Sequence, residues 1–233
     1  MKLIVIGDVH GRSSWKNLID HSALNVFVGD YFDPYDDISF EDLKQNFLDI
    51  IKFKIQYPEN VVLLYGNHDY HYFYKGDRST RYDYMHAGDI MHLFTEFAHL
   101  FYGVAYSPSD NYLISHAGLT KEWADKYLKD INSESPVKTI ESAINNLWES
   151  DKLPFAFEPN YWPGDCYGTS PTHSPIWVRD ETLYRHAFNM NLSWIQIMGH
   201  TQHIDIIKTG RVTENLIFVD CLGETEKSFE TFI

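Results

Sequence analysis

The chain has 233 residues, and its 19 lysines and arginines against 33 aspartates and glutamates give a formal net charge of −14 with histidine neutral. This length fits one large α/β domain or two small ones, and the negative charge argues against a duplex nucleic-acid binder, which needs lysine and arginine to neutralise phosphates. No apolar run approaches the roughly 18 residues of a membrane helix. Two cysteines, Cys166 and Cys221, make no disulfide framework. We therefore expect a reduced, cytoplasmic protein with no membrane and no duplex nucleic-acid partner.

Short apolar segments alternate with helical stretches along the chain, which predicts an α/β fold. Strands are expected, in chain order, at residues 2–6, 25–28, 61–65, 112–115, 194–198 and 216–219. Apolar residues recur at helical spacing from 40 to 57 and stop before Pro58, which predicts an amphipathic helix. Further helices are expected at 120–130 and 137–148.

Two stretches rich in aromatic residues, 70–84 and 154–175, differ from this pattern. Their tyrosine, proline and glycine content is typical of ordered loops or of a small cap. We expect one domain over residues 1–233, with cap-like insertions near 70–100 and 119–175.

Polar residues follow each predicted strand at the point where it ends. Five strands lead into the runs GDVHG (7–11), GDYFD (29–33), GNHD (66–69), SHAG (115–118) and GHTQH (199–203), and the sixth ends at Asp220. The carboxyl ends of strands are where α/β sheets place their chemistry. Residues two apart in an extended segment point the same way, so Asp8 and His10 can meet one ion. Mixed Asp, Asn and His ligands suit Mn²⁺, Fe²⁺ or Zn²⁺ better than Ca²⁺. About seven such ligands are too many for one ion with an open position, and fit two ions that share a carboxylate.

These ordered motifs resemble the calcineurin-like metallophosphoesterase superfamily. GDVHG, SHAGL, IWVRD and GHT are most similar to the bacterial members of its phosphoprotein-phosphatase branch, and the matches run from residue 7 to about 203. The resemblance implies a four-layer α/β/β/α sandwich of two mixed sheets flanked by helices, here with a small helical or loop cap.

The resemblance also implies roles for single residues. The metal ligands would be Asp8 and His10 on the first ion, Asp30 between both ions, and Asn67, His116 and His200 on the second. A hydroxide bridging the ions would attack phosphorus in line. His68, oriented by Asp33, would protonate or stabilise the leaving oxygen, a contribution of typically ~10²–10⁴-fold. We expect two divalent ions per chain, with Mn²⁺ favoured and Fe²⁺/Fe³⁺, Zn²⁺ or Ni²⁺ as alternatives.

The sequence departs from the family pattern at two places. Many phosphoprotein phosphatases carry a phosphate-gripping Arg where this chain has Pro34, so Arg179, together with Asn67, is the predicted substrate-binding pair. Arg179 could equally pair with the neighbouring Asp180, and Arg78 or Arg81 could replace the missing Arg. At the last motif, Gln202 stands where diesterases have a second His, so Gln202 is a candidate ligand of the first metal. His203 is one residue away from that position and therefore out of register with the diesterase motif.

Three functions remain open from the sequence. The leading hypothesis is a phosphatase that hydrolyses phosphomonoesters, its substrate a phosphorylated small molecule, a nucleotide or a phosphoprotein. The second is a phosphodiesterase or dinucleoside-polyphosphate hydrolase, favoured by Pro34 and by aromatic residues near the motifs. The third is an inactive metal-binding scaffold, against which the intact pair of His68 and Asp33 weighs.

Overall fold

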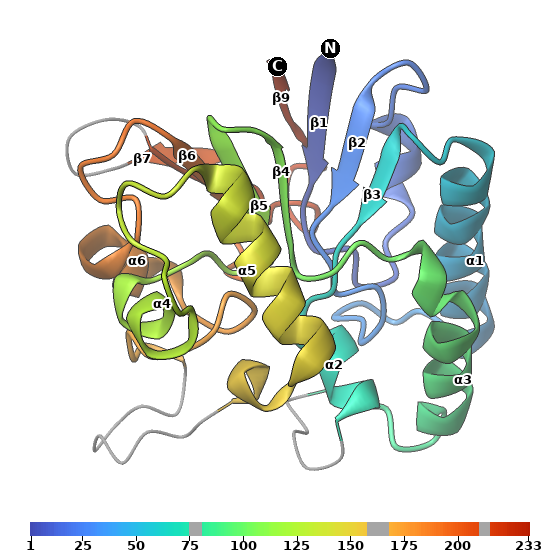
Figure 1. The fold of residues 1–233 in the computed structure, drawn as a ribbon. Coiled ribbons are helices and arrows are strands. Elements are labelled where there is room, and N and C mark those ends of the chain that lie inside the picture. The colour runs from blue at the N-terminus through green and yellow to red at the C-terminus, as the bar shows by residue number, and fades with distance from the viewer. Residues whose placement is uncertain (75–80, 158–167, 210–214) are drawn as a thin grey trace.

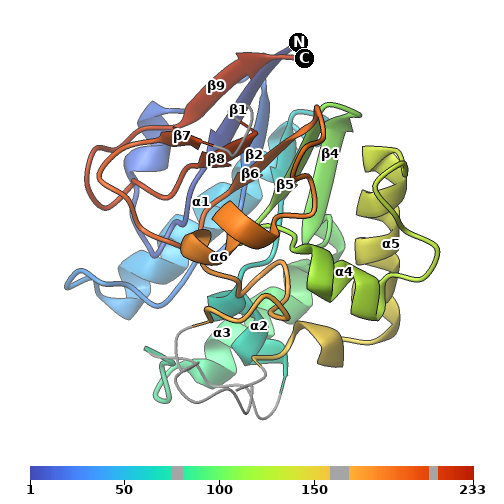
Figure 2. The same cartoon turned by 90° about the vertical axis from the view of Figure 1, so that its left-hand side faces the viewer.

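The computed structural model describes residues 1–74, 81–157, 168–209 and 215–233, and its strands form two sheets (Figures 1 and 2). The first has the order β3 (Val61–Leu63), β2 (Leu24–Phe27), β1 (Lys2–Ile6) and β9 (Phe229–Phe232). The second has the order β4 (Ala105–Ser109), β5 (Tyr112–Ser115), β6 (Ile195–Met198), β8 (Leu216–Phe218) and β7 (Ile207–Thr209). Both sheets are mixed, because parallel central strands carry antiparallel neighbours at β9, β4 and β7.

The two sheets pack against each other through their inner faces. Leu3 and Val5 of β1 share one buried cluster with Ile114 of β5, Ile197 of β6 and Ile217 of β8. Side chains alternate along a strand, so the other face of β1 packs into a second cluster that includes the helices. Burial on both faces explains why this strand is a continuous apolar run, since each fully buried Leu, Ile or Val contributes about 1.5–3 kcal/mol.

Helices cover the outer face of each sheet. α1 (Phe40–Gln56) and α3 (Ala87–Phe97) lie beside the first sheet, and α5 (Val137–Ser150) covers the second (Figure 1). Ser39 is the N-cap residue of α1, and its Oγ accepts a hydrogen bond of 3.2 Å from the Asp42 amide. The shorter elements are α2 (Asn67–Phe73), α4 (Lys121–Tyr127), α6 (Asp180–His186) and the 3₁₀ turns η1 (Ser14–Asn17), η2 (Ala98–Leu100) and η3 (Leu153–Phe155). The predicted α/β sandwich of two mixed sheets is confirmed.

One segment differs from its prediction. Residues 70–84 were expected to form a loop or cap, but the chain is helical from Asn67 to Phe73, because Tyr70, His71 and Tyr72 are buried there. The predicted stretch 154–175 is described only in part, since residues 158–167, which include Cys166, lie outside the described residues. Cys221 is buried and free. Within the described part of the chain, none of the helices is long and apolar enough to cross a bilayer.

Candidate active site

Six strands bring polar residues to one place. The residues that follow these strands are Asp8 after β1, Asp30 after β2, Asn67 after β3, His116 after β5, His200 after β6 and Asp220 after β8. All six are buried. The parallel strands β1, β2 and β3 of one sheet and β5, β6 and β8 of the other therefore deliver their carboxyl ends to a common edge.

Four of the predicted site residues have a left-handed backbone although none is glycine. The φ angles are 44° at His10, 56° at Asp30, 58° at Asp33 and 67° at His200. Such conformations cost of the order of 1–3 kcal/mol each and persist where the surroundings enforce them, commonly at functional sites. Asp69 helps to hold this backbone in place. Its carboxylate accepts hydrogen bonds from the backbone amides of Asp30 (2.8 Å), Tyr31 (3.0 Å) and Gly66 (2.8 Å).

Two glycines make room for the carboxylates. A Cβ on Gly66 would lie 2.1 Å from Oδ1 of Asp30, and a Cβ on Gly199 would lie 2.1 Å from Oδ1 of Asp8. Neither distance is possible for real atoms. The glycines of GNHD and GHT are thus required for the close approach of the backbone to the acidic residues.

Asp30 lies between imidazoles from both sheets. Its Oδ2 is 3.6 Å from His10 Nε2 and 3.4 Å from His116 Nε2, while its Oδ1 accepts a hydrogen bond of 2.9 Å from the His68 amide. His10 Nδ1 lies 3.0 Å from the carbonyl oxygens of both Phe32 and Asp33. In the neutral ring that nitrogen is the donor, so His10 Nε2 turns a lone pair toward the carboxylate.

A second set of lone pairs converges around His116. His116 Nδ1 is 3.1 Å from the Val28 carbonyl oxygen, which leaves Nε2 unprotonated in the neutral ring. That Nε2 lies 2.8 Å from Asn67 Oδ1 and 3.2 Å from His200 Nδ1. Two acceptors held this close repel each other unless a cation lies between them, so the donor set fits a bound metal.

Burial sets the charge of these groups. It raises the pKa of Asp30 well above its ordinary value, and the nearby carboxylates of Asp8 and Asp69 raise it further. Burial also lowers the pKa of His10 to about 3 and holds the pKa of His116 and His200 well below the ordinary value. The imidazoles are therefore neutral near pH 7, as metal ligands must be. The groups His10, Asp30 and His68, and Asp8, Asp30 and His116, each bring their ligand atoms close enough to hold one ion.

Asp220 belongs to the same cluster, although the sequence assigned it no role. Both carboxylate oxygens of Asp8 lie 3.0 Å from the His200 amide nitrogen, and Asp8 also interacts with Asp220. Burial raises the pKa of Asp220 to about 6, while the guanidinium groups of Arg12 and Arg179 lower it. One sequence feature could have indicated a role for Asp220, namely its position directly after a strand, which it shares with the predicted ligands.

His68 and Asp33 form the predicted pair, with His68 Nδ1 2.8 Å from Asp33 Oδ2. His71 adds a second imidazole, because its Nε2 lies 2.7 Å from the same oxygen. The Tyr72 hydroxyl donates to Oδ1 of Asp33. Burial alone would raise the pKa of Asp33, but hydrogen bonds from His68 and His71 outweigh it and lower the pKa. Asp33 is therefore an ionised carboxylate at neutral pH.

A cavity of about 130 Å³ opens onto this cluster. Its lining includes the candidate ligands Asp8, His10, Asp30, Asn67 and His200, but not the fully buried His116. The other lining residues are His68, Arg12, Tyr35, Trp177, Arg179, Gln202 and Asp220. Arg179 Nη1 donates a hydrogen bond of 3.3 Å to the His200 carbonyl. Gln202 is exposed and its Nε2 donates to Glu224 at 3.2 Å, so ligation by its amide oxygen remains a prediction.

Two of the residues considered as substitutes or alternatives have partners outside the candidate ligand set. Arg81 donates from Nη1 to the Pro34 carbonyl at 2.8 Å, and its guanidinium lies 4.1 Å from the centre of the Tyr35 ring. Tyr35 lines the cavity, so Arg81 contacts a residue of the cavity wall. His203 Nε2 is 3.5 Å from Asp180 Oδ2. Arg78 lies outside the described residues.

Two packed mixed sheets with a buried Asp, Asn and His set at their common edge define a metallohydrolase of the metallophosphoesterase class. Comparison with known families agrees, since the model for calcineurin-like phosphoesterases matches residues 1–203. The chain belongs to the calcineurin-like phosphoesterase family, and it is a hydrolase of phosphoric esters. The predicted family and enzyme class are confirmed. The family implies two divalent metal ions, and the His and Asp groups described above can hold metal.

Solved structures with the same fold include two phosphatases. A cold-active protein-tyrosine phosphatase of a psychrophile, Shewanella sp., has 18% identity and a TM-score of 0.55, and the match covers 94% of this chain and 71% of that one. A protein serine/threonine phosphatase from Saccharomyces cerevisiae with similarity to human phosphatase PP5 has 18% identity and a TM-score of 0.57, covering 94% of this chain and 66% of that one. At this identity the similarity concerns the fold. No curated protein matches the chain in sequence.

Proposed function

We propose that the chain is a phosphatase that hydrolyses phosphomonoesters with the help of two divalent cations. The observation that carries this proposal is the position of Asp30, whose Oδ2 lies 3.6 Å from His10 Nε2 and 3.4 Å from His116 Nε2. A carboxylate that belongs to two candidate ligand groups, each with its own imidazole, suits two ions that share one ligand.

The two ions would be held by separate ligand sets. Asp8, His10 and Asp30 would hold the first, and Asp30, Asn67, His116 and His200 the second. We propose Mn²⁺, because mixed oxygen and imidazole ligands suit it; Fe²⁺/Fe³⁺, Zn²⁺ and Ni²⁺ are the alternatives. When bound, such a pair activates a water molecule as nucleophile and offsets the charge of the phosphate.

His68 would give a proton to the leaving oxygen, with Asp33 as the group that orients its ring. The ring lies in the cavity wall beside the candidate ligands. The short contact of Nδ1 with Asp33 (2.8 Å) fixes the ring and leaves Nε2 for the substrate. This intact pair argues against the inactive scaffold.

Arg179 and Asn67 would bind the phosphoryl group. Arg179 and Arg12 both line the cavity, so two guanidinium groups border it although Pro34 replaces the usual Arg. A cavity of about 130 Å³ suits a small group such as phosphate. Hydrolysis of phosphodiesters or dinucleoside polyphosphates is the second candidate, because Tyr35 and Trp177 line the cavity and aromatic rings can stack on bases.

Relative rates decide between these candidates. Metal-loaded protein should hydrolyse an aryl phosphate faster than an aryl diester or a dinucleotide, and Asp8→Ala and His68→Asn should each lose most of that activity. A faster diester or dinucleotide rate would favour the second candidate. Bound metal with no turnover of any of the three esters, or equal turnover in wild type and variants, would contradict the proposal. The phosphorylated molecule acted on in the cell and the cytoplasmic location remain predictions.

A further inference from the structure

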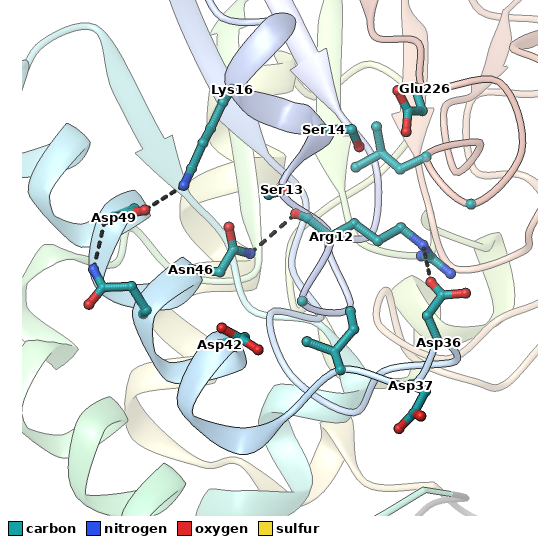
Figure 3. Close-up of a pocket in the computed structure, with 15 residues that line it drawn as sticks. Arg12, Ser13, Ser14, Lys16, Asp36, Asp37, Asp42, Asn46, Asp49 and Glu226 are labelled. Carbon is teal, nitrogen blue, oxygen red and sulfur yellow. Dashed lines mark hydrogen bonds and ion pairs between the residues drawn. The ribbon is translucent and has the colours of Figure 1, made fainter.

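Arg12 lies at the boundary between two cavities. It lines the catalytic cavity together with Asp8 and His10, and it also lines a larger cavity of about 630 Å³ that Figure 3 shows in close-up. Only 12% of the Arg12 side chain is exposed. The fold therefore places a nearly buried guanidinium group beside the candidate metal ligands, at a position to which no sequence motif gave a role.

Two hydrogen bonds fix the backbone of Arg12. Its amide donates to the Val9 carbonyl oxygen at 2.8 Å, which closes a turn over residues 9–12. Its own carbonyl oxygen accepts a hydrogen bond of 3.2 Å from Nδ2 of Asn46, a buried residue of α1 (Figure 3). The guanidinium group therefore extends from a backbone that is held in place on both sides of its peptide plane by the first strand-end turn and by a helix.

Asp36 holds the side chain of Arg12 through one nitrogen only. Arg12 Nε donates to Asp36 Oδ2 at 3.2 Å, as Figure 3 shows. Among the described residues, Nη1 and Nη2 of Arg12 donate no hydrogen bond, and Asp36 is the only carboxylate within ion-pair distance. Neither nitrogen is one of the fully buried polar atoms that lack a partner, so both reach accessible space. Two charged donor groups are therefore available to a bound anion.

The guanidinium group of Arg12 acts on the catalytic side of this boundary. Burial raises the pKa of Asp220 to about 6, and Arg12 has the largest effect among the groups that lower it. Arg12 Nη2 also lies near Gln202 of the catalytic cavity wall, because a Cβ on Gly223 would meet Nη2 at 2.9 Å and Gln202 Nε2 at 2.8 Å. Arg12 is thus close enough to Asp220 to affect its charge, and it makes no ion pair with it.

Arg12 also fits the departure of this chain from its family at Pro34. The proline offers no donor in place of the usual phosphate-gripping arginine. Arg81, considered as a substitute, donates to the Pro34 carbonyl and is not among the residues that line the catalytic cavity, whereas Arg12 is. Asp36, which holds Arg12, lies two residues after Pro34. The loop that lacks the arginine therefore supplies the carboxylate that orients an arginine from the neighbouring loop.

We propose that Arg12 is the second phosphate-binding guanidinium, with Asp36 as its positioning residue, and that Arg12 selects phosphomonoesters over phosphodiesters. This inference rests on the proposed phosphatase activity. A phosphomonoester has three terminal oxygens and a charge of about −1.5 to −2 at pH 7, whereas a diester has one terminal oxygen fewer and a single negative charge. Arg12 would donate from Nη1 and Nη2 to the oxygen that only the monoester has, while Arg179 binds the oxygens common to both esters.

The ratio of kcat/KM for an aryl monoester to that for the matching aryl diester tests the role of Arg12. Arg12→Gln should lower the monoester value about 10–100-fold, the range for a hydrogen bond to a charged group. The diester value should fall no more than about fivefold, since only a weak attraction to its single charge is lost. Arg185→Gln, which removes an exposed arginine of α6 outside the cavity, is the matched control and should keep the ratio. An unchanged ratio in Arg12→Gln would overturn the assignment.

Asp36→Asn tests the positioning role. Without the carboxylate the guanidinium group is less well aligned, so the monoester-to-diester ratio should fall about two- to fivefold, the size of an exposed ion pair. Asp37→Asn removes the same charge from the next residue, which is exposed and makes no ion pair among the described residues, and it should keep the ratio. In the Arg12→Gln background Asp36→Asn should have no further effect. Equal changes in the two aspartate variants, or an effect that persists in Arg12→Gln, would overturn the role of Asp36.

Binding of inorganic phosphate separates this inference from the proposed activity. Calorimetric titration of the Mn²⁺-loaded protein with phosphate gives an affinity that needs no turnover. Arg12→Gln should weaken this affinity about 10–100-fold with the Mn²⁺ stoichiometry unchanged, and Arg185→Gln should leave it as in wild type. If no phosphoester is hydrolysed but this difference is found, the phosphatase proposal fails and Arg12 remains a phosphate-binding residue. Equal phosphate affinity in wild type and Arg12→Gln, or no phosphate binding at all, overturns the inference.

Discussion

His71 and Asp33 are joined by a contact of 2.7 Å between Nε2 and Oδ2, on the same carboxylate oxygen that lies 2.8 Å from His68 Nδ1. One buried oxygen thus receives two imidazoles, and the Tyr72 hydroxyl occupies the other oxygen of the carboxylate. Asp33 has no freedom to turn away from His68. His71 is therefore a positioning residue for the proposed proton donor, acting through Asp33.

Replacing His71 should affect esters with poor leaving groups most. In His71→Phe the Asp33 carboxylate loses one of its donors, so proton transfer from His68 becomes less well aligned. We expect kcat to fall about tenfold for an alkyl phosphate, a part of the ~10²–10⁴-fold that an acid catalyst contributes, and about twofold for an aryl phosphate with a good leaving group. His71→Gln, which keeps a donor, should recover part of the loss. Equal losses on both esters would show that His71 serves only folding.

Asp30→Asn should stabilise the metal-free protein and destabilise the metal-loaded one relative to wild type. Burial and the neighbouring carboxylates raise the pKa of Asp30 above its ordinary 3.8. The folded state therefore holds that proton more tightly than the unfolded state, and metal-free stability falls as pH rises above 3.8 toward the raised value. Asparagine removes this cost, about 1–3 kcal/mol.

Bound metal should reverse this order of stability and make wild type more stable than Asp30→Asn. At a concentration 100 times its Kd, metal stabilises wild type by about 2.7 kcal/mol, and the variant, lacking the shared carboxylate, should gain far less. Urea unfolding at pH 7 gives the free energy of unfolding of wild type and variant, once with a chelator and once with Mn²⁺. A variant less stable than wild type in chelator would refute this view of the buried charges.

Gly66→Ala should strongly weaken metal binding, because the new Cβ would lie 2.1 Å from Oδ1 of Asp30 and the backbone must move. We expect metal affinity to fall at least about 100-fold, the upper end of the 10–100-fold found when groups that support metal ligands are altered. Gly88→Ala is the matched control, since a Cβ there meets nothing within 4 Å. Position 88 lies in α3, so alanine should stabilise the fold by about 0.5–1 kcal/mol. Calorimetric titration with Mn²⁺ compares the two, and unchanged affinity in Gly66→Ala would contradict the close approach.

Arg179→Lys should weaken phosphate binding more than it slows chemistry. Lysine keeps the charge but loses the planar fork that binds two oxygens. We expect KM for an aryl phosphate and the inhibition constant of inorganic phosphate to rise together, about tenfold, with metal stoichiometry unchanged. Steady-state kinetics with phosphate as inhibitor tests this, and unaltered inhibition would remove Arg179 from the phosphate site.

The sequence predicted the central strands and the ligand motifs because buried parallel strands are plain apolar runs and their ends are marked by glycine. It missed β4, β7 and β9, which are sheet edges with polar residues, and it missed α2, where aromatic and histidine residues hide the helical period. The contacts of His71 with Asp33 and of Asp220 with Asp8 link distant parts of the chain, so local patterns carry no trace of them.

The most direct test of the central claim is anomalous scattering from crystals of the protein grown with Mn²⁺. We predict two peaks per chain, one on each side of the Asp30 carboxylate, the first beside Asp8 and His10 and the second beside Asn67, His116 and His200. A single peak, or none within bonding distance of Asp30, would contradict the account.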